Sequence, residues 1–233
     1  MTNKVLQRDL IINSLIDYSS DNIKFISPDF GAKPLDEYRI KNKDSFIYPG
    51  IAEQLSADIA YGIALGEGLP IVYGMSPFIS ARCFEQYKVL FGQTDLPICI
   101  MPVGVGLGYD HNTLSHYSLD DIGLYSSVPG LKIYTPYDCD SANDILANWI
   151  NSKDQIVLRL ERQAMPKNII ESLEEDVAIN HYGLITKRGS NKLIISWGYL
   201  GIELLESPMF RDYDVFLFSY FNFDSTNDLA NLL

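Results

Sequence analysis

The sequence predicts an α/β fold in which a parallel sheet is wrapped by helices, followed by part of a second α/β domain. Short apolar runs, such as PIVYG at 70–74 and LPICIMPV at 96–103, alternate with segments of helical periodicity. The run at 96–103 is apolar almost throughout, which is typical of a strand buried on both faces. Such alternation indicates parallel strands that are connected by helices. Apolar residues make up 47% of the 233 residues, which is ample for a packed core.

The N-terminal elements can be placed from their periodicity and their turn residues. A helix is expected at 5–18 and a strand at 23–27. A charged loop of mobile character follows at 32–44. The turn at Pro49 and Gly50 opens a helix that is closed by Gly66 and Gly68. A strand at 70–74 and a single helix at 78–91 follow.

The helix after Gly50 is expected to be buried, because it is apolar nearly all round. One apolar stripe recurs every four residues: Ile51, Leu55, Ile59 and Ile63. Alanines that permit a close approach line much of the remaining surface: Ala52, Ala57, Ala60 and Ala64. Glu53 lies in the first turn, where a carboxylate either compensates the helix dipole or serves a function.

The rest of the first unit repeats the alternation around a long loop. The expected elements are a strand at 96–103, a glycine-rich and polar loop at 104–118, a helix at 120–127, a strand at 132–135, a helix at 141–151 and a strand at 155–160. Ligands of parallel sheets lie beyond the carboxyl ends of the strands. Those ends are the segments at Asp29, at 75–78 and at 104–116.

The composition of the chain changes after Pro166, which predicts two units. Residues 1–166 form the first domain, the acidic stretch 167–182 is a linker, and 183–233 begin a second, incomplete α/β domain. Within that second unit, strands are expected at 193–197 and 215–218 and a helix at 198–206.

Composition also argues against several classes of function. The net charge of −12 gives no electrostatic reason to bind nucleic acid, and no membrane span is expected because no window approaches 18 apolar residues. The N-terminus lacks the apolar core of a signal peptide. Three scattered cysteines without a CxxC pair are typical of reduced thiols, so we expect a cytoplasmic protein.

Residues Gly50–Gln54 read GIAEQ and open a helix after a strand and a turn. This segment resembles the signature of transketolases and 1-deoxyxylulose-5-phosphate synthases, which are thiamine diphosphate enzymes. The resemblance extends from about Lys24 to Pro166 and continues more weakly to the C-terminus. It implies a pyrimidine-binding domain in which Glu53 contacts the aminopyrimidine ring of the cofactor and takes part in catalysis.

The same resemblance implies two further cofactor contacts. Phe78, in SPFISARCFEQ, corresponds to an aromatic residue that stacks on the pyrimidine, although Phe84 competes for this role and either ring could belong to the core. Asp29 ends its strand, as an acidic residue of the family does, and is expected to bind the cofactor.

Substrate contacts are implied for three residues. His116, in a Ser-His pair that follows Tyr109, is expected to bind substrate oxygens and move protons; the alternative is a surface histidine. Arg162, in LRLERQAMP, would bind a phosphate, unless the neighbouring Glu161 pairs with it. His111 lies in the same loop as His116 and is a further candidate. Asn112 replaces an Asp of the single-chain transketolases, which leaves the sugar open.

The Gly-Asp-Gly of the family's diphosphate and metal site does not occur in the sequence. We therefore expect the diphosphate and Mg²⁺ to be bound by a partner, with no metal ligand on this chain. The prediction is the pyrimidine-binding subunit of a split transketolase-like enzyme, which transfers a two-carbon ketol unit between sugars or sugar phosphates. It would act only with a diphosphate-binding N-terminal subunit, as an α2β2 hetero-oligomer.

Two alternatives stay open. The first is a β-type subunit of a 2-oxoacid dehydrogenase or decarboxylase, which VPGLKIYTP resembles locally, or a 1-deoxyxylulose-5-phosphate synthase-like enzyme. The second is a non-catalytic structural partner, which the presence of Glu53 disfavours.

Overall fold

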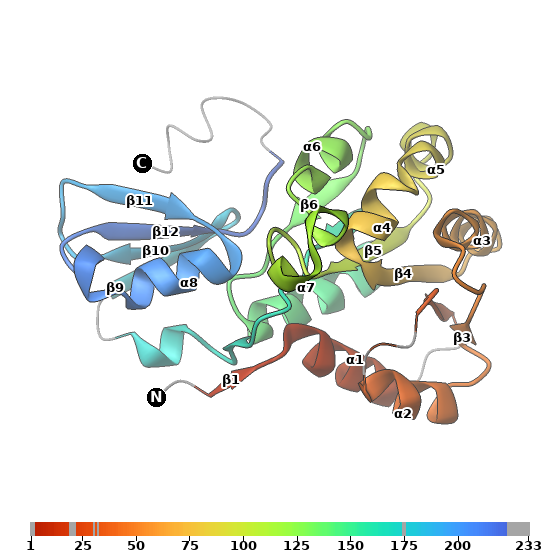
Figure 1. Ribbon diagram of the computed structural model, residues 1–233, viewed down its shortest axis with the longest axis horizontal. Helices are drawn as coiled ribbons and strands as arrows, with labels where there is room; N and C mark the ends of the chain where they lie inside the picture. The colour runs from red at the N-terminus through yellow and green to blue at the C-terminus, as the bar shows by residue number, and fades with distance from the viewer. Residues whose placement is uncertain (1–2, 19–21, 30, 32, 174–175, 223–233) are drawn as a thin grey trace.

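The computed structural model describes residues 3–18, 22–29, 31, 33–173 and 176–222. A larger sheet with its helices and a smaller sheet with its own helix lie side by side (Figure 1). Residues 223–233 of the predicted second domain lie outside the described residues. The boundaries at 1–166, 167–182 and 183–233 stay a prediction.

The larger sheet is parallel and has six strands in the order β3-β2-β4-β5-β7-β6. Its strands are β2 (Ile23–Ile26), β3 (Phe46–Ile47), β4 (Leu69–Met75), β5 (Ile98–Val103), β6 (Lys132–Tyr134) and β7 (Gln155–Leu158). Every residue of β5 is buried, as its apolar run predicts. The predicted parallel sheet is thereby confirmed.

Helices cover both faces of this sheet (Figure 1). One face carries α1 (Gln7–Asp17), α2 (Lys33–Lys41) and α7 (Cys139–Ser152). The other face carries α3 (Glu53–Leu65), α4 (Ser76–Ala81), α5 (Phe84–Val89) and α6 (Asp121–Ser126). Each face therefore has its own apolar core, and the carboxyl ends of the strands are left for the loops.

Helix α2 corrects the expectation of a charged loop at 32–44. Leu35 and Tyr38, one helical turn apart, are both buried, and the Tyr38 ring lies 5.2 Å from that of Phe25. Arg39 and Lys41 form ion pairs with carboxylates three and four residues earlier. Two buried anchors and neighbouring opposite charges are enough for a short helix, although they leave little apolar periodicity in the sequence.

The burial of α3 differs from the prediction. Its alanines face the sheet, and Ala57 and Ala60 are fully buried. The aliphatic stripe is buried only in part: Ile51 is 81% and Leu55 46% exposed, whereas Ile59 and Ile63 pack partly buried against the core. Small side chains allow the helix to lie close on the sheet, and this close approach decides which face is buried.

The helix predicted at 78–91 is broken in two. Helix α4 ends at Ala81 and α5 begins at Phe84, with Cys83 at φ −100° and ψ 4° between them. Arg82 lies at this break. Tyr87 and Phe91 are buried on the sheet side of the second half.

The smaller sheet has four strands in the order β11-β12-β10-β9. They are β9 (Asp176–Asn180), β10 (Gly183–Lys187), β11 (Leu193–Ser196) and β12 (Asp214–Phe218), with α8 (Gly198–Glu206) after β11. Strand β9 falls inside the stretch predicted as a linker, and it pairs antiparallel with β10. The short strands β1 (Lys4–Val5) and β8 (Met165–Pro166) also pair, so the start of the chain lies against the end of the first unit.

All three cysteines are buried and unbridged. Burial raises the pKa of the Cys83 and Cys139 thiols to about 12. Among the described residues, no helix combines the length and the apolar character needed to span a bilayer.

Candidate functional site

Most predicted site residues follow neighbouring strands of the larger sheet. Asp29 follows β2, Phe78 follows β4, His116 lies in the loop after β5, and Arg162 follows β7. These four strands are adjacent in the order β2-β4-β5-β7. Because parallel strands end at the same edge, the sheet carries these segments to one side of the molecule.

Glu53 is the first residue of α3 and is only 7% exposed. The turn before it depends on Gly50, whose φ of +83° is readily adopted by glycine. Glu53 Oε1 accepts a hydrogen bond of 2.6 Å from Arg82 Nη1. The buried Glu53 carboxylate is therefore paired with the guanidinium of Arg82.

Arg82 and Phe78 form the next contact. The guanidinium carbon of Arg82 lies 4.1 Å from the centroid of the Phe78 ring, over its face. The sequence interpretation did not single out Arg82. Its spacing of four residues from Phe78 was the available signal, since such residues lie on the same side of a helix.

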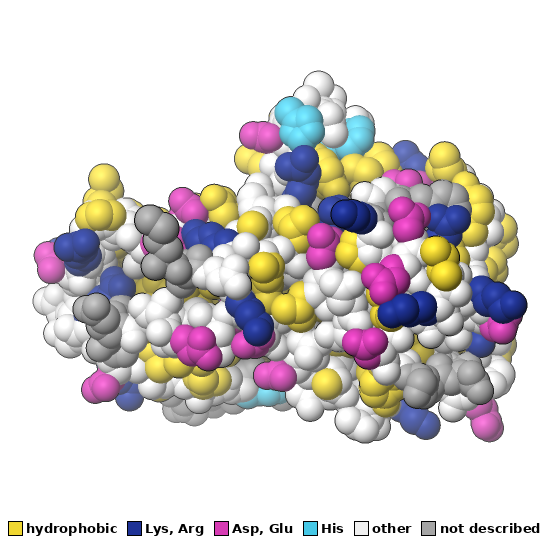
Figure 2. All heavy atoms as spheres, turned by 90° about the horizontal axis from the view of Figure 1, so that it is seen from below, with side chains coloured by type: hydrophobic (Ala, Val, Ile, Leu, Met, Phe, Trp, Pro, Cys, Tyr) yellow, Lys and Arg dark blue, Asp and Glu magenta, His cyan; other side chains and the backbone are white. Residues whose placement is uncertain are grey.

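The loop after β5 brings both candidate histidines to the site. The His116 ring lies 5.3 Å from Phe78 and 6.3 Å from Tyr109, and Ser115 Oγ lies 2.9 Å from His116 Nδ1. His111 is more exposed, with its ring 6.3 Å from Tyr109. Histidine side chains stand on a projecting edge of the molecule, close to Lys and Arg side chains in this view (Figure 2).

This loop is fixed at its base. Gly106 and Ser118 exchange backbone hydrogen bonds of 3.0 and 2.9 Å, and the buried hydroxyls of Ser76 and Ser118 lie 2.6 Å apart. Gly104 has a φ of +75°, and a side chain there would overlap the Tyr109 ring. The contact between Ser76 and Ser118 joins the start of α4 to the end of the loop, which places Phe78 beside His116.

Arg162 extends the cluster at its other end. Its guanidinium carbon lies 4.9 Å from the centroid of Tyr109. Glu161 does not accompany it: its Oε1 accepts a 2.9 Å hydrogen bond from Tyr199 N, at the start of α8. The alternative that Glu161 pairs with Arg162 is therefore wrong. Burial raises the pKa of the Glu161 carboxyl, partly opposed by the Tyr199 N–H bond.

A buried ion pair involves Arg159, three residues before Arg162 in the sequence. Arg159 Nε and Nη2 donate to the two Asp121 oxygens at 2.8 and 3.2 Å, and Nη1 donates to Thr135 Oγ1 at 2.6 Å. Asp121 and Arg159 are 1% and 3% exposed. The pair joins α6 to the chain leaving β7, and the sequence interpretation missed it because both residues resemble ordinary surface charges.

Asp29 is exposed at the end of β2, and its carbonyl accepts a hydrogen bond of 2.5 Å from Ser27 Oγ within the same turn. The predicted roles of Asp29 in cofactor binding and of His111 in substrate binding stay predictions.

Residues 23–167 match the family described as transketolase, pyrimidine binding domain. The chain belongs to this family. The resemblance inferred from the GIAEQ segment is confirmed, and the matched residues contain Glu53 and the other predicted site residues.

Relatives of the transketolase pyrimidine-binding domain include proteins named as transketolase subunits. The chain is 27% identical over 124 residues to a subunit of the apulose-4-phosphate transketolase of Actinobacillus succinogenes, covering 53% of this chain and 40% of that one. It is 20% identical over 201 residues to a 6-deoxy-6-sulfo-D-fructose transketolase subunit of a Clostridium species, covering 85% of this chain and 62% of that one. The 1-deoxy-D-xylulose-5-phosphate synthase of Corynebacterium glutamicum is 29% identical over 168 residues, which are 71% of this chain and 26% of the synthase. The chain spans about half the length of the curated transketolase subunits that it matches.

Solved transketolases share the fold. A split-gene transketolase, described as an inactive β4 tetramer, superposes with a TM-score of 0.74 at 20% identity, covering 92% of this chain and 71% of that one. The transketolase of Leishmania mexicana superposes with a TM-score of 0.73 at 16% identity, covering 94% of this chain and 35% of that one. These likenesses support the arrangement of both units.

The site fits the pyrimidine group named in the family's description. Glu53 offers a buried carboxylate to a ring N–H, and Phe78 offers an aromatic face to a planar heterocycle. A guanidinium, which is likewise planar and carries N–H donors, makes both contacts in this structure.

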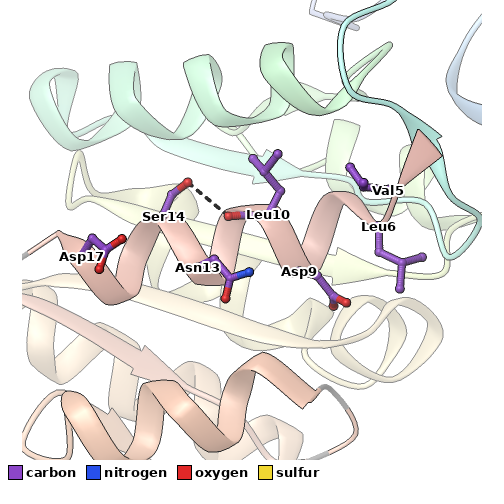
Figure 3. Close-up of a pocket in the computed structure, with 7 residues that line it drawn as sticks. All are labelled: Val5, Leu6, Asp9, Leu10, Asn13, Ser14 and Asp17. Atoms are coloured by element: carbon purple, nitrogen blue, oxygen red, sulfur yellow. Dashed lines mark hydrogen bonds between the residues drawn. The ribbon is translucent and has the colours of Figure 1, made fainter. Parts of the chain in front are cut away.

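Other hollows of this transketolase-type domain lie outside the cluster. Figure 3 shows a groove of about 570 Å³ along α1, with Ser14 Oγ bonded to the Leu10 carbonyl at 3.1 Å. Its lining contains none of the predicted site residues: Val5, Leu6, Asp9, Leu10, Asn13, Ser14 and Asp17. Within the part of the chain that the structure describes, no three His, Cys, Asp or Glu side chains are grouped to hold a metal ion.

Proposed function

We propose that this chain is the pyrimidine-binding subunit of a split transketolase-like enzyme that transfers a two-carbon ketol unit between sugars or sugar phosphates. The observation that carries the proposal is a buried Glu53 carboxylate and a Phe78 ring that both contact Arg82, at the carboxyl edge of a parallel sheet. The relatives named as transketolase subunits support the reaction class.

Glu53 and Phe78 are the residues that would hold the aminopyrimidine of thiamine diphosphate. Phe78 would orient the ring by stacking, and Glu53 would hold a proton at the pyrimidine ring nitrogen. When bound, thiamine diphosphate supplies the nucleophilic carbon that takes up the two-carbon unit. The protein supplies orientation and a place for this proton.

The loop after β5 and the chain after β7 would bind substrate. His116 can donate to or accept from a sugar hydroxyl or carbonyl oxygen, and His111 would contact the outer part of the same molecule. Arg162 is exposed, and its planar fork of donors matches a phosphate. Arg162 and His116 both lie next to the Tyr109 ring, so one substrate molecule could meet both side chains.

The partner would supply the diphosphate and Mg²⁺ site, since this chain has no Gly-Asp-Gly segment. The description of a related β4 assembly as inactive agrees with an activity that needs a second kind of subunit. We propose an α2β2 hetero-oligomer in the cytoplasm, where three buried, unbridged cysteines would stay reduced.

A 1-deoxyxylulose-5-phosphate synthase-like activity is the second candidate, favoured by the likeness to the Corynebacterium enzyme. A 2-oxoacid dehydrogenase subunit and a structural partner are the remaining alternatives. Supplying the assembled enzyme with ketoses or with 2-oxoacids as donors separates the transketolase reaction from both alternative activities, and a structural partner would use neither donor.

The decisive experiment replaces Glu53 with Gln in the chain assembled with its partner. Gln keeps the size of the side chain but cannot exchange a proton with the ring nitrogen. Hydrogen–deuterium exchange at C2 of bound thiamine diphosphate should slow by at least about 100-fold. Glu67→Gln, an exposed change at the other end of α3, is the matched control. Wild-type exchange in Glu53→Gln would refute the proposal.

A further inference from the structure

Arg82 makes the two contacts that the proposed function assigns to the aminopyrimidine. Its Nη1 donates to Glu53 Oε1 at 2.6 Å, and its guanidinium carbon lies 4.1 Å over the Phe78 ring. A guanidinium and an aminopyrimidine share the relevant chemistry, since both are flat, stack on aromatic faces and present N–H groups in their plane.

Both partners are already in contact with other side chains. The Glu53 side chain is only 9% exposed, and its Oε1 is paired with Arg82. His116 contacts the Phe78 ring at a centroid distance of 5.3 Å and an interplanar angle of 67°. A heterocycle that makes both contacts therefore competes with the Arg82 guanidinium for Glu53 Oε1 and for the Phe78 ring.

Arg82 is suited to give up its contacts with Glu53 and Phe78. Its side chain is 49% exposed, and it lies at the break between α4 and α5. Long, flexible side chains at such positions can turn into solvent with little disturbance of the core. While it stays, it neutralises a carboxylate that would otherwise be buried without a partner.

We propose that Arg82 is a displaceable stand-in for the cofactor's aminopyrimidine: its guanidinium makes the contacts to Glu53 and Phe78 that the pyrimidine would make, and it must be expelled when the cofactor binds. This inference rests on the proposed function and adds a competing residue of the chain itself to the site. Arg82 therefore weakens cofactor binding, and it keeps Glu53 paired until the pyrimidine arrives.

The expected effect follows from the contacts that are lost. A part-exposed ion pair and a cation–π contact each change an equilibrium by about two- to fivefold. Removing both should tighten cofactor binding by roughly four- to 25-fold. Arg82→Lys keeps the charge but loses the planar group, so it should give a smaller gain.

The test titrates thiamine diphosphate calorimetrically into the assembled complex that carries wild-type chain, Arg82→Gln or Arg82→Lys. Lys88→Gln is the matched control, because Lys88 lies over the neighbouring Phe84 ring at 5.5 Å. We expect the Kd to fall in the order wild type, Arg82→Lys, Arg82→Gln, with Lys88→Gln unchanged. Circular dichroism melts confirm that each variant is folded.

The other outcomes separate the two proposals. Equal Kd values for the wild type and both Arg82 variants would overturn the inference and leave the proposed function standing. Weaker binding by the variants would also overturn it, because Arg82 would then hold the cofactor. If neither the wild type nor any variant binds thiamine diphosphate in the complex, the proposed function fails, and the inference fails with it.

Discussion

The buried ion pair between Asp121 and Arg159 offers a direct test of how the site is supported. It joins α6 to the chain after β7, three residues before Arg162. Asp121→Asn keeps the shape of the side chain and removes its charge. The Arg159 guanidinium, 3% exposed, is then left without its counter-charge.

The loss should be large. Breaking a buried ion pair by removing one partner destabilises a protein by about 3–5 kcal/mol. At about 2–4 °C per kcal/mol for a chain of this size, the melting midpoint should fall by roughly 6–20 °C. The pair between Lys132 and Asp154 is the natural comparison, since its side chains are 39% and 37% exposed. Asp154→Asn should cost no more than about 1 kcal/mol.

Urea unfolding followed by circular dichroism measures both variants. The double variant Asp121→Leu with Arg159→Met should recover most of the loss, because well-packed apolar groups often replace a buried ion pair without penalty. If Asp121→Asn loses no more free energy of unfolding than Asp154→Asn, the buried pair does not support the site as argued.

Three further predictions concern the loop, the junction with α8 and the chemistry. Gly104→Ala should lower the free energy of unfolding by about 1–3 kcal/mol and change the near-ultraviolet dichroism of Tyr109, because it forces a side chain into a positive φ and onto that ring; an unchanged spectrum would contradict this. Burial raises the pKa of the Glu161 carboxyl in the folded protein above its ordinary value of 4.5. The stability that Glu161 contributes is therefore fully present below pH 4.5 and is lost as the pH rises through the folded pKa. Glu161→Gln should therefore gain stability relative to the wild type from pH 4.5 upward in urea titrations, and a constant difference would rule this out. In the assembled complex, His116→Ala should slow turnover of a phosphorylated ketose by about 100-fold while the cofactor Kd stays the same; unchanged turnover would return His116 to the role of a surface residue.

Most strands and helices of the larger unit could be read from the sequence in their order, because apolar periodicity reports local structure directly. The side on which α3 is buried could not, since Ile51 and Ala57 are both apolar and only the distance to the sheet separates them. Helix α2 was missed for a related reason: its fold depends on the partners of Leu35 and Tyr38, which are distant in sequence.

The candidate site shows the same division. Glu53 and Phe78 belong to segments with a recognisable pattern, so they could be named in advance. Arg82 and Arg159 could not, because a lone arginine gives no signal until its carboxylate partner is placed in space. Pairing across the fold is the information that a single sequence lacks.

The burial of all three thiols has a practical consequence for measuring motion. Cys83, Cys99 and Cys139 are fully buried, and burial raises the pKa of each, so none presents a reactive thiolate to a maleimide in the native protein. A cysteine introduced at the exposed Ser115 would then be labelled selectively without removing the natural ones. A fluorophore at that position would report on the loop beside His116 in an otherwise unaltered chain, in real time, as ligands and the partner are added.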